Sequence, residues 1–421
     1  MDRSRILQKF AAVALASASV FAATAAFAGE VTIWCWDPNF NVAIMKEAGA
    51  RYTAKHPGTT FNVVDFAKAD VEQKLQTALS SGTTEALPDI VLIEDYGAQK
   101  YLQSFPGAFA ELSGKIDFKG FAPYKVQLMT LNDKVYGMPF DSGVTGMYYR
   151  KDYLEQAGFK PEDMQNITWE RFIEIGKQVE AKTGHKMMGI DPNDAGLIRI
   201  LMQSGGQWYF DNDGNLNIEK NAALKAALET EAKLLQANIY KPTAGWNNWV
   251  ASFTSGDVAS VITGVWITGT VKAQADQKGK WGVAPIPSLD ANAGHASNLG
   301  GSSWYVLESS KEKDEAIDFL NEVYAKDVDF YQKILIDQGA VGSFLDARKG
   351  PTYSAADDFF GGEKVWQNFS DWLVKVPSVN YGVYTNEVDN AVTANLPALA
   401  KGTPVDDVLK AIQEQAEGQI Q

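Results

Sequence analysis

A chain of 421 residues, of which 45% are apolar and 21% charged, is long enough for two domains and does not have the composition of a disordered protein. Its formal charge of −14 argues against nucleic acid and anionic membranes as partners, because an acidic surface is repelled by both. Cys35 is the only cysteine, which excludes an internal disulfide bond, and its place between Trp34 and Trp36 favours a buried, unreactive thiol.

The first 28 residues have the pattern of a cleavable secretory signal peptide. Three basic residues within the first nine precede an apolar segment over residues 10–26, and Ala26-Phe27-Ala28 matches a cleavage site. A membrane anchor is the alternative, but the apolar segment is short and ends in small residues. Gly29, not a cysteine, follows the expected cleavage site, so we expect a soluble chain without lipid attachment. Without the leader it carries 35 basic and 51 acidic residues, a net charge of −16.

Residues 31–97 alternate between strand and helix patterns. We expect strands over 31–36, 61–66 and 89–93, with one helix over 42–55 and another beginning near Asp70. This order predicts a parallel sheet with helices on both faces, in which ligands bind outside the carboxyl ends of the strands. The predicted strands end in Trp36-Asp37, in residues 66–68 and in Glu94-Asp95, which should therefore share one edge.

Residues 137–152 interrupt this alternation and are interpreted as a crossing between two domains. A Gly/Pro turn is followed by Asp141, two further glycines and an aromatic strand. Residues 298–307 have the same makeup and predict a second crossing, and residues 339–344 a third. Other expected elements are helices over 221–237, 311–324 and 328–338, strands over 258–264 and 281–287, and a largely helical tail over 354–421.

Catalytic motifs are not apparent. His56, His185 and His295 are far apart and lie beside Pro or Gly or in polar turns, which makes a metal site or a histidine-based triad improbable. The sequence also lacks the nucleophile-elbow, zinc-protease, P-loop and dinucleotide-binding motifs. A pair of cleft carboxylates could hydrolyse glycosides, and the candidates for such a pair are Asp37, Glu94, Asp95 and Asp141.

Tryptophan is abundant, and many of the 11 tryptophans fall in turns or at the starts of elements beside polar residues. Indole faces stack on sugar rings, while neighbouring carboxylates and amides hydrogen-bond the hydroxyl groups. Packing in the core or at its rim is the alternative for each ring taken singly. The tryptophans in question are Trp36, Trp208, Trp246, Trp249 and Trp266, and Tyr381 and Tyr384 could add a further aromatic wall.

Several motifs together give a resemblance to the extracellular solute-binding proteins of ABC sugar importers, the family that includes the maltose-binding protein. The resemblance spans residues 29–421, with one small departure from the family pattern over residues 132–139. The motifs that carry it are residues 88–95, 137–154, 253–257 with 264–266, and 316–320.

The resemblance implies a two-lobe α/β fold of the type II periplasmic-binding-protein kind, each lobe a mostly parallel sheet flanked by helices. The ligand cleft lies between the lobes. The implied N-terminal lobe comprises residues 29–142 and 302–343, and the C-terminal lobe residues 143–301 and 344–421.

The family's ligand-binding positions correspond to one group of residues from each lobe. The first-lobe wall would use Trp36, Asp37, Asn41, Lys68, Glu94, Asp95 and Asp141. The second wall and the hinge would use Trp208, Tyr209, Trp246, Asn248, Trp266, Gly301, Ser302, Tyr381 and Tyr384.

The implied function is that of a periplasmic substrate-binding component of an ABC transporter. It would capture a disaccharide or short oligosaccharide, with lactose as the first candidate, and deliver it as a monomer to membrane permease subunits with a cytoplasmic ATPase. No catalysis, cofactor, metal or nucleic acid is implied. The alternative is a secreted glycoside hydrolase that uses paired cleft carboxylates.

Overall fold

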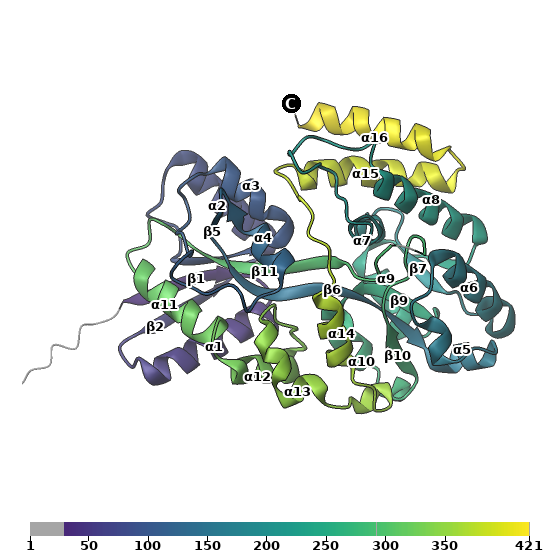
Figure 1. Cartoon of the computed structure of the whole chain (residues 1–421), viewed down its shortest axis with the longest axis horizontal. Helices are drawn as coiled ribbons and strands as arrows, with labels where there is room; N and C mark the ends of the chain where they lie inside the picture. The colour runs from purple at the N-terminus through teal and green to yellow at the C-terminus, as the bar shows by residue number, and fades with distance from the viewer. Residues whose placement is uncertain (1–28, 292, 421) are drawn as a thin grey trace, which may run out of the picture.

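The computed structural model describes residues 29–291 and 293–420, so the predicted signal peptide lies outside the described residues. Figure 1 shows two α/β halves joined along two long strands that run through the centre of the molecule. Across the described residues, no helix combines the length and the apolar character needed to cross a membrane. The predicted α/β class is confirmed.

The first half begins with the predicted alternation of strands and helices. The elements are β1 (Glu30–Cys35), α1 (Asn41–Lys55), β2 (Thr60–Asp65), α2 (Lys68–Ser81) and β3 (Ile90–Glu94). β1 lies between β2 and β3 and pairs with both in parallel. The carboxyl ends of the three strands therefore lie at one edge of the sheet, as the sequence predicts.

Strand β6 (Met138–Arg150) is buried along all 13 of its residues and extends from the first half into the second. Near its start it pairs antiparallel with β11 (Asn298–Val306), which in turn pairs antiparallel with β3. Farther along it pairs with β9 (Ser260–Gly264) and β10 (Trp281–Ala284). The resulting seven-stranded sheet has the order β10-β6-β11-β3-β1-β2, with β9 also on β6.

One expectation about the sheet is wrong for the second half, where we expected mostly parallel pairing. β6 enters this half as the continuation of a strand from the first half, and β9 and β10 run in the opposite direction beside it. The only parallel ladder that the described residues form there is the short pair β7 (Met188–Ile190) and β8 (Tyr240–Pro242).

Helices cover both halves of the sheet. After β11 the chain returns to the first half, where α11 (Lys313–Tyr324) and α12 (Val328–Gln338) pack on α1. The helical tail then packs on the second half, α14 (Val365–Leu373) on β6 and α15 (Thr385–Ala400) on α8 (Ala222–Ala237). The remaining α-helices and strands are α3 (Ala98–Ser104), α4 (Pro123–Leu128), β4 (Thr130–Leu131), β5 (Lys134–Val135), α5 (Lys151–Gln156), α6 (Trp169–Thr183), α7 (Gly196–Ser204), α9 (Gly245–Thr254), α10 (Thr268–Lys272), α13 (Pro351–Ser354) and α16 (Val405–Gln419).

Glycines let β6 and β11 approach each other closely where they cross between the halves. A Cβ atom at Gly143 would lie 2.1 Å from the carbonyl oxygen of Leu299. Gly301 has a φ of +88°, and a Cβ there would lie 2.8 Å from a carboxylate oxygen of Asp95. The segment after α12 lies along the same crossing, since the amide of Ser142 donates to Val341 and that of Ser343 to Phe140. The three predicted crossing segments thus lie side by side.

Gly143→Ala should lower the thermal midpoint of unfolding, because the added methyl group collides with backbone that cannot rotate away. Overpacking of this kind costs about 1–3 kcal/mol. Gly269→Ala, in α10 where an added Cβ meets nothing within 4 Å, is the matched control and should not destabilise. Equal stability of the two variants in urea unfolding would contradict the close approach.

Candidate functional site

A cleft of about 520 Å³ opens between the halves, above the crossing of β6 and β11. Its walls come from the carboxyl ends of β1 and β3, from β11, and from the loops and helices of the second half. The lining residues are Trp36, Asp37, Phe40, Asn41, Glu94, Tyr96, Asp141, Asp194, Gly196, Arg199, Trp246, Trp266, Ile267, Thr270, Leu299, Gly300, Gly301 and Ser302.

Many of the residues predicted for the site lie together in this cleft. The edge predicted from the strand ends supplies the first-half wall, and the two predicted crossings supply the floor. The predicted residues that line the cleft are Trp36, Asp37, Asn41, Glu94, Asp141, Trp246, Trp266, Gly301 and Ser302.

Tryptophans form an aromatic wall on the second-half side. The ring centroids of Trp246 and Trp266 are 5.8 Å apart with an interplanar angle of 34°, and Trp249 lies 5.3 Å from Trp246. The indole nitrogen of Trp266 donates to the carbonyl of Leu299 at 2.9 Å, which fixes its ring against β11. Trp246 is 57% exposed. A large indole left open beside a second indole is an apolar surface available to a ligand.

Asp141 both lines the cleft and joins the two central strands. Its Oδ1 accepts hydrogen bonds from the amide of Ser302 at 2.8 Å and from the Ser302 hydroxyl at 2.6 Å. Burial raises the pKa of the Asp141 carboxyl, while Lys125 and the bonds from Ser302 oppose that shift. A carboxylate fixed by two donors is a preoriented hydrogen-bond acceptor.

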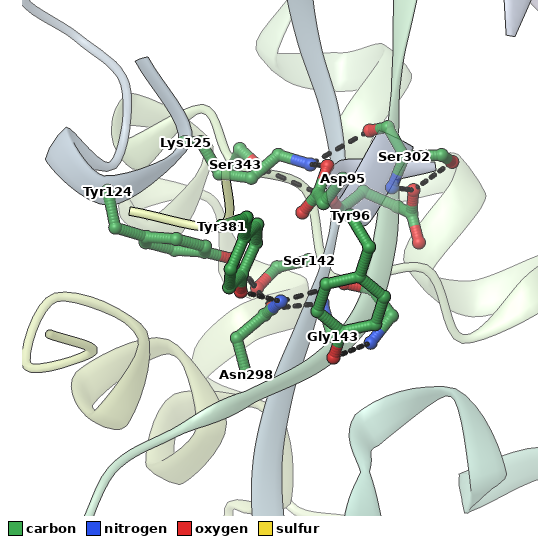
Figure 2. A network of polar contacts seen from close by, with 12 residues as sticks. Asp95, Tyr96, Tyr124, Lys125, Ser142, Gly143, Asn298, Ser302, Ser343 and Tyr381 are labelled. Carbon is green, nitrogen blue, oxygen red and sulfur yellow. Dashed lines mark hydrogen bonds and ion pairs between the residues drawn. The ribbon is translucent and has the colours of Figure 1, made fainter. Parts of the chain in front are cut away.

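Asp95 lies behind the cleft floor in a buried polar network (Figure 2). Lys125 Nζ donates to Asp95 at 2.6 Å and to the carbonyl of Ser302 at 2.9 Å. Both side chains are at most 1% exposed, and burial raises the pKa of Asp95 against the opposing charge of Lys125. Asp95 therefore ties β3 to β11 from behind and does not line the cleft.

A second part of the same network fastens β11 to β6 (Figure 2). The Oδ1 atom of Asn298 accepts from the hydroxyl of Tyr124 and from the amide of Gly143, each at 3.0 Å. The amide of Gly300 donates to the hydroxyl of Tyr96 at 3.1 Å. The backbone at the floor of the cleft is thus held from several sides.

Three of the predicted aromatic residues lie behind the cleft wall. Trp208 is 1% exposed, and Tyr209 and Tyr381 are fully buried. Trp208 stacks on Tyr96 at 5.5 Å with an interplanar angle of 17°, and Tyr381 packs edge-on against the same ring at 4.9 Å. These three residues support the ring of Tyr96, which does line the cleft. They are buried because α15 packs over the loop that carries Trp208, a loop that the sequence suggests is open.

Three other predicted residues also lie outside the lining. Lys68 forms an ion pair with the carboxylate of Glu94. Asn248 is exposed on α9 and donates to the carbonyl of Ala244 at 2.8 Å. Tyr384, 41% exposed, precedes α15. That Lys68, Asn248 and Tyr384 contact the ligand stays a prediction.

Arg199 is a cleft residue that the sequence analysis missed. It lies 3.5 Å from Asp194 and 3.5 Å from Asp389, and its guanidinium lies 5.3 Å from the centre of the Tyr96 ring. These partners raise its pKa although burial opposes the shift. The sequence does contain a signal for this residue, because Arg199 is the single charged residue in the apolar helix Gly196–Ser204.

Within the described ranges, no cluster of three or more His, Cys, Asp or Glu side chains could hold a metal ion. The histidines contact other parts of the protein, His56 the carboxylate of Glu322, His185 the ring of Tyr153 and His295 the carbonyl of Ile286. None of them lines the cleft.

Comparison with known proteins gives matches over most of the chain. A family model described as bacterial extracellular solute-binding protein matches residues 47–361. The chain is 73% identical over 100% of its own length and 100% of the relative's to a protein of Rhizobium radiobacter named lactose-binding protein.

Solved structures show the same fold. The sugar-binding protein MalE from Xanthomonas citri superposes with a TM-score of 0.78 at 18% identity, over 93% of this chain and 96% of that one. The galacto-N-biose-/lacto-N-biose I-binding protein of an ABC transporter from Bifidobacterium longum gives 0.74 at 23% identity, over 93% and 97%. The predicted family is therefore confirmed: the chain belongs to the bacterial extracellular solute-binding proteins, and it is the non-enzymatic, sugar-binding component of an ABC importer.

Proposed function

We propose that this protein captures lactose, or a closely related disaccharide, in the cleft and delivers it to the membrane permease of its importer. The observation that carries the choice of sugar is the 73% identity, over the full length, to the protein named lactose-binding protein. Substitutions at this level leave most side chains of a binding site unchanged, so a shared ligand is the simplest expectation.

The chemistry of the cleft supports a neutral sugar. Trp246 and Trp266 offer an apolar surface on which the C–H face of a pyranose ring can stack. Asp37, Asn41 and Asp141 line the other side and offer acceptors, with an additional amide donor on Asn41, to hydroxyl groups. A binding site for a sugar needs both an apolar surface and hydrogen-bonding groups, because each sugar ring has apolar faces and a polar edge.

The proposed lobes comprise residues 29–142 with 302–343 and residues 143–301 with 344–421. The return of α11 and α12 to α1, and the packing of the tail on the second half, support this division. Closure about the crossing strands would bring the two walls together on the sugar, as periplasmic binding proteins do by hinge motion. The sugar favours the closed state because only that state contacts it from both sides.

We propose that the protein is located in the periplasm. The extracellular character of the family and the signal-peptide pattern of residues 1–28 support this location. The proposed partners are the permease subunits and their cytoplasmic ATPase, which a monomer in the closed state would engage.

Isothermal titration of the purified protein against a sugar panel tests the ligand. We expect lactose to bind with a heat that maltose, arabinose oligosaccharides and amino acids do not give, and to raise the thermal midpoint of unfolding. If another sugar binds more tightly than lactose, that sugar is the ligand and lactose is not. Release of glucose from lactose above the blank would contradict a purely binding role.

Trp266→Ala should weaken lactose binding by roughly thirtyfold, which corresponds to about 2 kcal/mol, because it removes a central stacking surface. Trp266→Phe is the matched variant, since it keeps a smaller aromatic ring while losing the bond to Leu299, and it should bind more tightly than the alanine variant. Trp34→Ala, in a ring that packs on Phe66 outside the cleft, should leave the affinity unchanged. An alanine variant at position 266 that is folded and binds like the wild type would remove Trp266 from the stacking wall.

A further inference from the structure

A second, smaller cavity of about 150 Å³ opens beside the cleft, within the second half. We call it the side pocket. It is lined by residues of β7, α7, α8, α9 and β9, and it shares Asp194, Gly196, Trp246, Trp266 and Leu299 with the cleft. The side pocket and the cleft therefore adjoin each other at these residues.

Glu231, on α8, brings an unpaired carboxyl group to this pocket. The residue is 2% exposed, and its Oε2 is buried without a hydrogen-bond partner in the described part of the chain. Ile190, Ile200 and Trp249 line the same pocket and give it apolar walls. Burial, with a smaller contribution from the charge of Asp194, raises the pKa of Glu231 to about 8.

Other carboxyl groups near the cleft each accept at least one hydrogen bond within the protein, although the buried Oδ2 of Asp95 also lacks a partner among the described residues. Asp95 accepts from Lys125, Asp141 from Ser302, and Asp389 from Tyr209 at 2.7 Å. Burying a polar group without a partner is unfavourable, so an apolar residue of similar size at position 231 would give a more stable ligand-free protein. A carboxyl group in such a place calls for a hydrogen-bonding partner that the described residues do not supply.

We propose that the side pocket receives one end of the saccharide bound in the cleft, and that Glu231 hydrogen-bonds a hydroxyl group of that end. This inference rests on the proposed function, because it requires that a sugar bind in the cleft. It makes Glu231 a residue that determines specificity.

The chemistry of the pocket defines the class of ligand end that it accepts. A carboxyl group protonated at neutral pH has one donor and an acceptor, which together match the acceptor and donor of a sugar hydroxyl. Asp191 and Asp194 also line the pocket, so the carboxylate of a uronic acid would meet like charge there. The volume of about 150 Å³ limits the occupant to a single terminal group of the saccharide. The pocket therefore selects a neutral, hydroxyl-bearing end.

Three variants test the role of Glu231, each titrated with lactose at pH 6.5. Glu231→Leu should weaken binding at least tenfold, while its thermal midpoint without sugar stays at or above that of the wild type. Glu231→Gln keeps a donor and an acceptor and should lose at most about threefold. Glu229→Leu, on the exposed face of the same helix, is the matched control and should bind as the wild type does.

Monodeoxy derivatives of lactose separate a direct contact from an indirect effect on folding. On the wild type, one derivative should bind at least tenfold more weakly than lactose. On Glu231→Leu, the same derivative and lactose should bind equally well. The inference is overturned if Glu231→Leu binds lactose like the wild type, or if every derivative loses the same factor on both proteins. Failure of the wild type to bind any sugar of the panel would instead overturn the proposed function.

Discussion

The antiparallel pairing of β6 with β11 is the constraint on which the rest of the cleft depends. The Asp141–Ser302 bonds lie at this crossing, where the lack of side chains at Gly143 and Gly301 lets the two backbones approach. A carboxylate in such a place is costly unless its charge is satisfied, and the donors of Ser302 and the nearby Lys125 satisfy it. The same bonds fix Asp141 at the floor of the cleft, so one interaction both holds the strands and orients a ligand-facing group.

Behind the cleft lies a second arrangement that preorganises it. Tyr96 follows β3 in the first half; it stacks on Trp208 from the second half, and Tyr381 packs edge-on against it. Arg199 lies 5.3 Å from the centre of the Tyr96 ring and is held by Asp194 and Asp389. Groups that are fixed before the ligand arrives lose less conformational entropy on binding. The buried aromatic residues thus contribute to binding without contacting the ligand.

The sequence was sufficient for the elements that depend on local pattern. The alternation over β1 to β3 predicts a parallel sheet, and strand ends in a parallel sheet share an edge, which places Trp36, Asp37 and Glu94 together. The glycine-rich crossings could be predicted because close backbone approach requires glycine.

The positions that the sequence could not assign depend on contacts between distant segments. Trp208 and Tyr381 have the composition of open turns, yet a hydrogen bond from Trp208 to Thr385 and mutual packing bury them. The direction of β9 and β10 against β6 is likewise a property of topology that periodicity does not contain. Arg199 and Glu231 each interrupt an apolar helix face, a signal that becomes informative only once the helix is known to border a cavity.

Both walls of the cleft present groups that a ligand could pair or cover. At the floor and on the first-half side, Asp141 is paired with Ser302 and Glu94 with Lys68, but the buried Oδ1 of Asn41 has no partner among the described residues. On the second-half side, Trp246 is exposed and the buried Oε2 of Glu231 has no partner among the described residues. A sugar that covers the indole and pairs the carboxyl group removes two unfavourable features of the ligand-free state at once. Under the proposed function, a sugar would therefore gain free energy at both walls, while the fixed carboxylate of Asp141 would set its orientation.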